Sequence, residues 1–119
     1  MSSAMSIDID ETELDAGGRV CRDGEPYSGE VVRRAPDGQV IALTTYLQGF
    51  EDGMSLEWFA DGRRRVVGRS RYGVGAVGVW RVWHRCGALA AEYGFSDTGR
   101  PQFVRRWDPS GAVIENTIY

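Results

Sequence analysis

The sequence predicts an all-β fold in which antiparallel β-hairpins follow one another as a meander of about four repeats. Three observations support this prediction. Glycines that suit tight turns recur with separations of 24, 25 and 24 residues, at Gly38, Gly62, Gly87 and Gly111. A tryptophan lies four residues before each of the last three glycines, at Trp58, Trp83 and Trp107. A longer phrase occurs twice, first as Tyr46, Gly49, Gly53, Trp58 and Gly62, and again as Tyr72, Gly75, Gly78, Trp83 and Gly87.

The first 22 residues differ in character from the rest of the chain. Residues 1–30 carry eight acidic side chains against two arginines, although the whole chain has a net charge of only −3. Ile7 and Ile9 alternate with acidic residues, and Gly17 and Gly18 end this segment. We therefore expect residues 1–22 to form a short, mobile, acidic leader with room for one edge strand, and residues 23–119 to form the repeat domain.

Each repeat is expected to contain a strand, a tight turn, a second strand and a looser turn with glycine. In the first repeat, residues 31–34 lead into Asp37-Gly38, and residues 40–46 lead out. Asp-Gly between β-branched runs is a strong hairpin signal. Glycine fits these turns because they need a positive φ, which is costly for a residue with a Cβ. The later strands before a turn glycine are expected at 54–59, 79–84 and 103–107.

Alignment of the strands on their turn glycines places like residues in rows across the sheet. The first row contains only tryptophan, and the next row on that face contains Arg81 and Arg105. Period-2 alternation puts Trp80 on the opposite face, in a row with Ser55 and Val104. We expect the tryptophan row to lie on the buried face of a one-sided sheet.

Several of these residues together carry a resemblance to a known family. They are the opening Asp23-Gly24-Glu25-Pro26-Tyr27-Ser28-Gly29, the Tyr-x-x-Gly units followed by glycine and an aromatic residue, and the Asp-Gly turns. Residues 23 to about 116 thus resemble the bacterial MORN-repeat variant family, which includes YwqK-like antitoxin components. Departures from its pattern are Cys86 in a turn, Arg34 in place of an aromatic residue, and residues 98–101. The resemblance implies a MORN-like hairpin array that contacts other molecules and has no catalytic residues.

Composition and motifs argue against several classes of function. The chain has no apolar stretch of membrane-span length and no secretory signal, so we expect a cytoplasmic protein without a membrane span. Cys21 and Cys86 are too few for a disulfide framework. His84 is the only histidine, which removes most metal sites, and a Cys86, His84 and Asp108 arrangement is the one nucleophilic alternative. We expect no enzyme activity, no metal and no cofactor.

The sequence therefore favours a non-enzymatic protein-interaction module, in the form of an antitoxin or immunity protein that binds and occludes a toxin. The alternative is a structural scaffold or self-associating repeat protein. A nucleic acid or an anionic membrane surface is a weaker alternative, because 17 acidic residues outnumber the 14 basic ones. Tryptophan, tyrosine and arginine dominate interface hot spots. The candidate partner-binding residues are Trp80, Tyr72, Arg63, Arg64 and Arg65.

The two ends of an open meander lead to a further expectation. Unpaired strand edges must be covered, charged or paired. Arg33, Arg34 and Pro36 suit a protected edge, whereas residues 112–119 are apolar and almost uncharged. We expect the C-terminal edge to be covered by a partner or by a second copy, as in a homodimer formed through a sheet edge.

Overall fold

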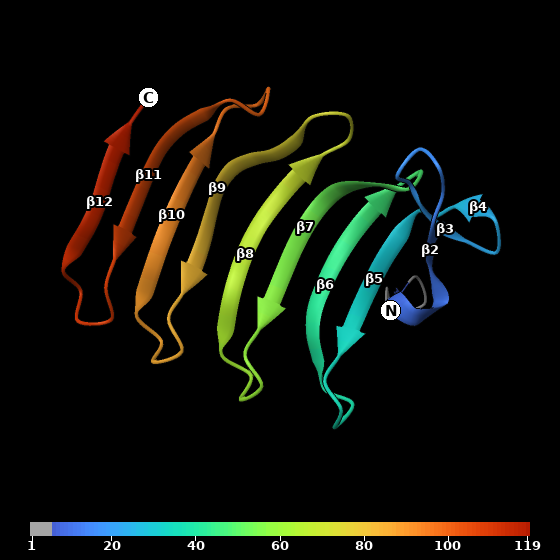
Figure 1. Ribbon diagram of the computed structural model, residues 1–119, viewed down its shortest axis with the longest axis horizontal. Coiled ribbons are helices and arrows are strands. Elements are labelled where there is room, and N and C mark those ends of the chain that lie inside the picture. Colours follow the sequence, from blue (N-terminus) through green and yellow to red (C-terminus); the bar gives the residue numbers. More distant parts are fainter. Residues whose placement is uncertain (1–5) are drawn as a thin grey trace.

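One long sheet, antiparallel from β5 onward, holds most of the chain in the computed structural model, which describes residues 6–119 (Figure 1). Within these residues, the sheet has nine strands in the order β1-β5-β6-β7-β8-β9-β10-β11-β12, so each strand from β5 onward pairs with the next one along the chain. This confirms the predicted all-β meander of antiparallel hairpins. Its strands are β5 (Gly29–Arg34), β6 (Val40–Leu47), β7 (Phe50–Trp58), β8 (Arg64–Arg71), β9 (Gly75–Trp83), β10 (Leu89–Phe95), β11 (Pro101–Trp107) and β12 (Val113–Ile118).

The four predicted turn glycines all lie in hairpin turns at the same end of the strands. Each has a φ between 90° and 97°, and each donates its N–H to the carbonyl three residues earlier at 2.8 or 2.9 Å. The turns join β5 to β6, β7 to β8, β9 to β10 and β11 to β12, at Gly38, Gly62, Gly87 and Gly111. The 24- to 25-residue period is therefore the length of one pair of strands with its two connections.

Side chains support these turns in different ways. Asp37 and Asp61 each accept the N–H of the residue two positions later at 2.9 Å, whereas Cys86 occupies the same position in the third turn. In the last turn Asp108 accepts the Ser110 hydroxyl at 2.6 Å and backbone N–H groups, and these bonds hold the pKa of its carboxyl below the ordinary value. The turn at Cys86 forms without such a carboxylate, so the glycine conformation is the shared requirement.

At the opposite end of the strands, the β6–β7 turn differs from the expected looser connection. Gln48 and Gly49, with φ values of 49° and 88°, form a two-residue turn between the paired residues Leu47 and Phe50. This is the tight form typical of β-hairpins. The second glycines of the repeated phrase, Gly53 and Gly78, are not in turns but within β7 and β9, where the register shifts at a bulge. Gln102 occupies the corresponding position in β11.

The N-terminal segment folds against the first strands of the sheet. The expected edge strand is β1 (Ser6–Asp8), which runs parallel to β5 with Ile7 beside Val31. It is followed by the 3₁₀ turn η2 (Ile9–Glu11) and a small sheet of β2 (Glu13–Leu14), β3 (Val20–Arg22) and β4 (Glu25–Pro26). Ile7 is buried, and Cys21 is only 3% exposed.

The expected mobile leader is therefore wrong for residues 6–22, because their buried side chains and strand pairing tie them to the sheet. The backbone hydrogen bond from Val20 to Gly49, at 2.9 Å, joins β3 to the β6–β7 turn, and the bond from Gly49 to Tyr27, at 2.8 Å, completes the contact. The expected boundary between residues 22 and 23 falls within the β3–β4 hairpin. Residues 1–5 of the expected leader lie outside the described residues.

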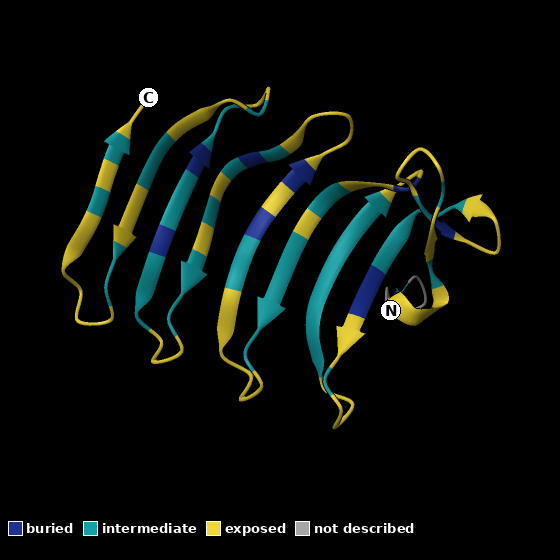
Figure 2. Ribbon diagram, in the orientation of Figure 1, coloured by how far each residue is buried: buried dark blue, intermediate teal, exposed yellow. Residues whose placement is uncertain are grey.

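Burial is shallow throughout the described residues (Figure 2). No large side chain of residues 6–119 is fully buried, and the buried hydrophobic residues are Ile7, Cys21, Val31, Val32, Val77 and Ala91. They lie on several strands and project from both sides of the sheet, since neighbours such as Val31 and Val32 point to opposite faces. Stability must therefore come from strand pairing and neighbouring side chains on each face, not from a core between two layers.

The tryptophan row is half-buried, so the expectation that its face is the buried one is wrong. The described part of β6–β12 forms a single layer, in which neither face is covered by a second sheet (Figure 1). Trp83 is covered in part by Arg64, whose guanidinium carbon lies 5.0 Å from the ring centroid. For Trp83, an arginine guanidinium thus takes the place of a second layer.

Replacement of Trp83 by alanine is expected to lower the free energy of unfolding by about 2 kcal/mol. Truncation of a fully buried aromatic residue costs about 3–5 kcal/mol, and this half-buried ring should lose about half of that. Urea unfolding followed by circular dichroism measures the change. A loss of about 4 kcal/mol, the value for a core tryptophan, would mean that this face is covered in solution and would contradict the single-layer interpretation.

Candidate protein-binding face

Trp80 packs its ring against the backbone of the neighbouring strand β8. Gly68 lies directly beneath the indole, and a Cβ at this position would overlap three of its ring carbons. The indole N–H donates to the carbonyl of Arg69 at 3.0 Å. The orientation of the ring is therefore fixed on one side by close packing and at the nitrogen by a hydrogen bond. Its remaining surface lines two adjoining hollows.

The first hollow lies between Trp80 and the strand on its other side, β10. Trp80 pairs with Tyr93, which pairs in turn with Val104, so these side chains share one face of the sheet. The hollow has a volume of about 240 Å³, and all of its lining residues are apolar or aromatic: Ala76, Trp80, Val82, Tyr93 and Phe95. Trp80 and Val104 thus share one face, as predicted. Ser55, the third residue of the predicted row, pairs with Gly68, the residue beneath the Trp80 ring.

The second hollow extends the same surface toward the β6–β7 and β8–β9 turns. It has a volume of about 440 Å³ and is lined by Phe50, Glu51, Ser70, Arg71, Gly73, Val74, Gly75, Ala76 and Trp80. Tyr72 lies beside it, with its ring edge-on to Phe50 at a centroid distance of 5.8 Å. Phe50, Tyr72 and Val74 are all exposed. We call the surface formed by Phe50, Tyr72, Val74, Trp80, Tyr93 and Phe95 the aromatic patch.

The opposite face of the same strands is charged where the aromatic patch is apolar. Glu92 forms ion pairs with Arg81 at 3.0 Å and with Arg105 at 3.5 Å, so a row of paired charges crosses β9, β10 and β11. Arg105 also covers Phe103, whose ring packs over Gly94 as Trp80 packs over Gly68. The two faces therefore use the same ring-over-glycine packing, but only the Trp80 face leaves the aromatic surface free of charged neighbours at its centre.

The structure separates the predicted arginines from Tyr72. At the start of β8 lie Arg63, Arg64 and Arg65, whereas Tyr72 follows the last residue of this strand. At 3.3 Å per residue, the length of β8 separates the arginines from Tyr72 by about 23 Å. Arg64 covers Trp83 on the charged face, whereas Arg65 pairs with Glu57 at 3.8 Å. Arg63 donates to the carbonyl of Arg85 at 3.2 Å. Of the predicted partner-binding residues, only Trp80 and Tyr72 lie in the aromatic patch.

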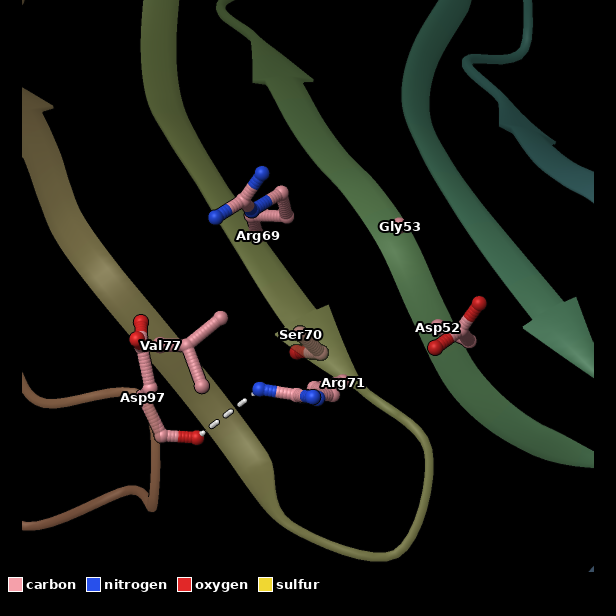
Figure 3. A pocket seen from close by; sticks show the side chains of 7 residues that line it. All are labelled: Asp52, Gly53, Arg69, Ser70, Arg71, Val77 and Asp97. Atoms are coloured by element: carbon pink, nitrogen blue, oxygen red, sulfur yellow. Dashed lines mark hydrogen bonds between the residues drawn. The ribbon is translucent and has the colours of Figure 1, made fainter.

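A polar pocket, which sequence reasoning missed, lies near the end of β8 (Figure 3). It has a volume of about 360 Å³ and is lined by Asp52, Gly53, Arg69, Ser70, Arg71, Val77 and Asp97. Arg71 donates to the carbonyl of Asp97 at 3.4 Å, and Asp52 accepts the backbone N–H of Tyr72 at 2.8 Å. Two arginines and two aspartates line the pocket together, so its charges offset one another and do not favour a simple anion or cation.

The nucleophilic alternative is not assembled. The His84 Nε2–H donates to the carbonyl of Trp107 at 2.8 Å, and Asp108 is engaged in its own turn. Cys86 is exposed in the turn after β9. Across the described residues 6–119, no group of three or more potential metal ligands is found. No helix in that range has the length and apolar character needed to cross a membrane.

Comparisons with known proteins give no match: no family model, no curated protein and no solved structure is similar to this chain. The resemblance to the MORN-repeat variant family therefore stays a prediction. The aromatic patch contains residues that the sequence did not single out, namely Phe50, Val74, Tyr93 and Phe95. A signal was available in Gly68, a glycine inside a strand and outside any turn, because such a glycine often marks close approach by another group.

Proposed function

We propose that this protein is a binding module that holds a protein partner on the aromatic patch. The observation that carries the proposal is Trp80, an indole held in one orientation with apolar hollows on two sides. Fixed aromatic side chains are typical hot-spot residues, because they bury a large area and lose little conformational entropy on binding. Phe50, Tyr72 and Val74 of the patch are exposed, as a free binding surface requires, whereas Trp80, Tyr93 and Phe95 are half-buried.

The chemistry of the patch indicates the kind of partner. Its hollows are open and apolar, so they suit a convex apolar segment on a folded protein, with Trp80 between two contact points. Glu51 and Arg71 are the charged residues that line them, which offers hydrogen bonds at the rim. A single-stranded nucleic acid would instead need several basic side chains among the aromatic ones. The patch therefore favours a protein over a nucleic acid.

The finer form of this proposal comes from the resemblance, which implies an antitoxin or immunity protein that occludes a toxin. The product of a neighbouring gene is the first partner to test. A rigid sheet face with a central hot spot would suit steric occlusion, since no catalytic group is needed for it. Binding by this product without inhibition of its activity would favour a binding module of another kind.

The test compares two matched variants that each remove a ring lying over a strand glycine. Trp80→Ala removes the ring of the aromatic patch, and Phe103→Ala removes the ring on the charged face. We expect Trp80→Ala to weaken partner binding by about 30-fold, which corresponds to the hot-spot threshold of about 2 kcal/mol. Phe103→Ala should change the affinity by less than about threefold. It should lower the free energy of unfolding about as much as Trp80→Ala does. Calorimetric titration measures both affinities.

The same affinity for Trp80→Ala and for the unmodified protein would exclude the aromatic patch as the partner site. Circular dichroism at the temperature of the titration establishes that both variants are folded. A loss of binding in Phe103→Ala alone would assign the partner to the charged face.

The alternative function, a self-associating scaffold, is favoured by a different observation, the free edge of β12.

A further inference from the structure

The last strand of the sheet, β12, has an open outer edge. It pairs with β11 on one side, and no other strand of the described residues 6–119 lies on its other side (Figure 1). Val113 is 63% exposed, and Ile118 is 75% exposed. Glu115 is its only charged residue, and this carboxylate is already paired with Arg106 at 3.3 Å. β12 thus has no proline and no unpaired charged side chain, the features that usually protect an edge strand.

The other end of the sheet is closed in a different way. β1 is hydrogen-bonded along β5, and the Arg34 guanidinium pairs with Asp8 of β1 at 3.6 Å. At the edge of β5 that would receive the β12 strand of another molecule, residues 30–32 are therefore already paired. Head-to-tail stacking of copies, which would build an open filament, would have to displace β1 from these residues. A self-complementary pair through β12 remains available, and it closes after two copies.

We propose that two copies of this chain pair through β12, in antiparallel orientation, to form one continuous sheet across a two-fold axis. The occupant of the free edge is thus a second copy. This arrangement satisfies the exposed backbone groups of both edges at once and covers the apolar side chains of residues 113–118. The inference does not depend on the function proposed for the aromatic patch, which lies on interior strands.

The backbone geometry indicates the register of this pairing. The Tyr119 N–H donates to the carbonyl of Gln102 at 2.9 Å, so it points inward, and by alternation the N–H groups of Ile118 and Asn116 point outward. Directly opposite residues on antiparallel strands share a face, so a symmetric pair must be centred on a residue. Centring on Asn116 aligns residues 114–118 of the two outward-facing strands and brings Ile118 opposite Ile114 of the other copy.

The neighbouring registers are less favourable. Centring on Glu115 would place two carboxylates directly opposite each other, and like charges in that position destabilise a strand pair. Centring on Thr117 would shorten the overlap, because β12 ends at Ile118. We therefore assign the two-fold axis to Asn116.

Sedimentation velocity over a concentration series tests the proposal. We expect the full chain to form a dimer, and two edge variants to weaken association at least about tenfold. Asn116→Pro removes an outward N–H, a change that an edge strand tolerates without loss of its inner pairing. Ile118→Lys adds a charge to the edge. The matched control is Val79→Lys, an exposed residue in the same cross-strand row as Ile118 but on an interior strand, which should remain dimeric.

Cysteine cross-linking tests the register. With Cys86 replaced by alanine, we expect Asn116→Cys to form a disulfide-linked dimer on mild oxidation, because hydrogen-bonded opposite residues have Cα atoms about 5.5 Å apart. Glu115→Cys should cross-link less. Preferential cross-linking of Glu115→Cys would overturn the register. A monomer at every concentration, or a dimer that neither edge variant weakens, would overturn the proposal itself and leave the function of the aromatic patch untouched.

Discussion

Gly68→Ala is expected to lower the free energy of unfolding by about 3 kcal/mol, although alanine normally stabilises a strand relative to glycine. The physical reason is the ring of Trp80, which occupies the space that a Cβ at residue 68 would need. The ring must move away, lose its contact with β8 and give up the hydrogen bond to Arg69. Urea unfolding measures the stability, and the tryptophan emission spectrum should shift as an indole is released to solvent.

Two further glycine variants make this prediction specific. Gly94→Ala would meet the ring of Phe103 in the same way on the opposite face, so it should cost about as much stability without displacing Trp80. Gly17→Ala would make only an ordinary contact, at 3.5 Å from the carboxylate of Asp15, and should change stability by less than about 0.5 kcal/mol. A Gly68→Ala protein as stable as the unmodified chain would contradict the packing of Trp80 described above.

Gly49→Ala is expected to cost about 3 kcal/mol and to detach the small N-terminal sheet. Gly49 has a φ of 88°, and a Cβ there would lie 2.7 Å from Arg19 Cβ and 3.0 Å from the Val20 carbonyl oxygen. The added atom therefore combines backbone strain of about 1–2 kcal/mol with a clash against the segment that Gly49 holds by hydrogen bonds. Hydrogen exchange should show faster exchange in residues 13–27, and urea unfolding should show the loss of stability.

The matched control is Gly73→Ala, in the β8–β9 turn, which lies at the same end of the strands as the β6–β7 turn. Gly73 also has a positive φ, 75°, but its missing Cβ would meet no atom within 4 Å. It should therefore show the backbone strain alone, about 1–2 kcal/mol, with no change in the exchange of residues 13–27. Equal effects of the two variants would mean that the clash is relieved without cost, and that the N-terminal sheet is not held through this turn.

Several features of the fold follow from short segments, and the sequence predicts these correctly. A tight turn needs a positive φ at a defined position, so Gly38, Gly62, Gly87 and Gly111 indicate the hairpins without knowledge of their surroundings. Alternation within a strand depends only on the backbone, which is why Trp80 and Trp83 could be assigned to opposite faces. The regular spacing of the turns then gives the strand order of the meander.

The remaining features depend on contacts between distant residues. Burial of the tryptophan row was predicted wrongly because alternation says which residues share a face, but not whether anything covers that face. Ile7 is buried in a segment whose acidic composition favours a solvated leader, since its neighbour Val31 is far along the chain. The aromatic patch likewise depends on register shifts at the bulges, which are decided by pairing between the neighbouring strands β6 to β10.

The sequence by itself thus determined the hairpin repeat, through local conformational preferences that recur about every 24 residues. Only the tertiary structure decided which aromatic side chains gather on one face and which arginines cover the other. The physical reason is that a single-layer sheet has no common core into which apolar residues must point. Each ring instead packs on whatever lies beside it on the next strand, and for Trp80 this is Gly68, which leaves the indole on an open face.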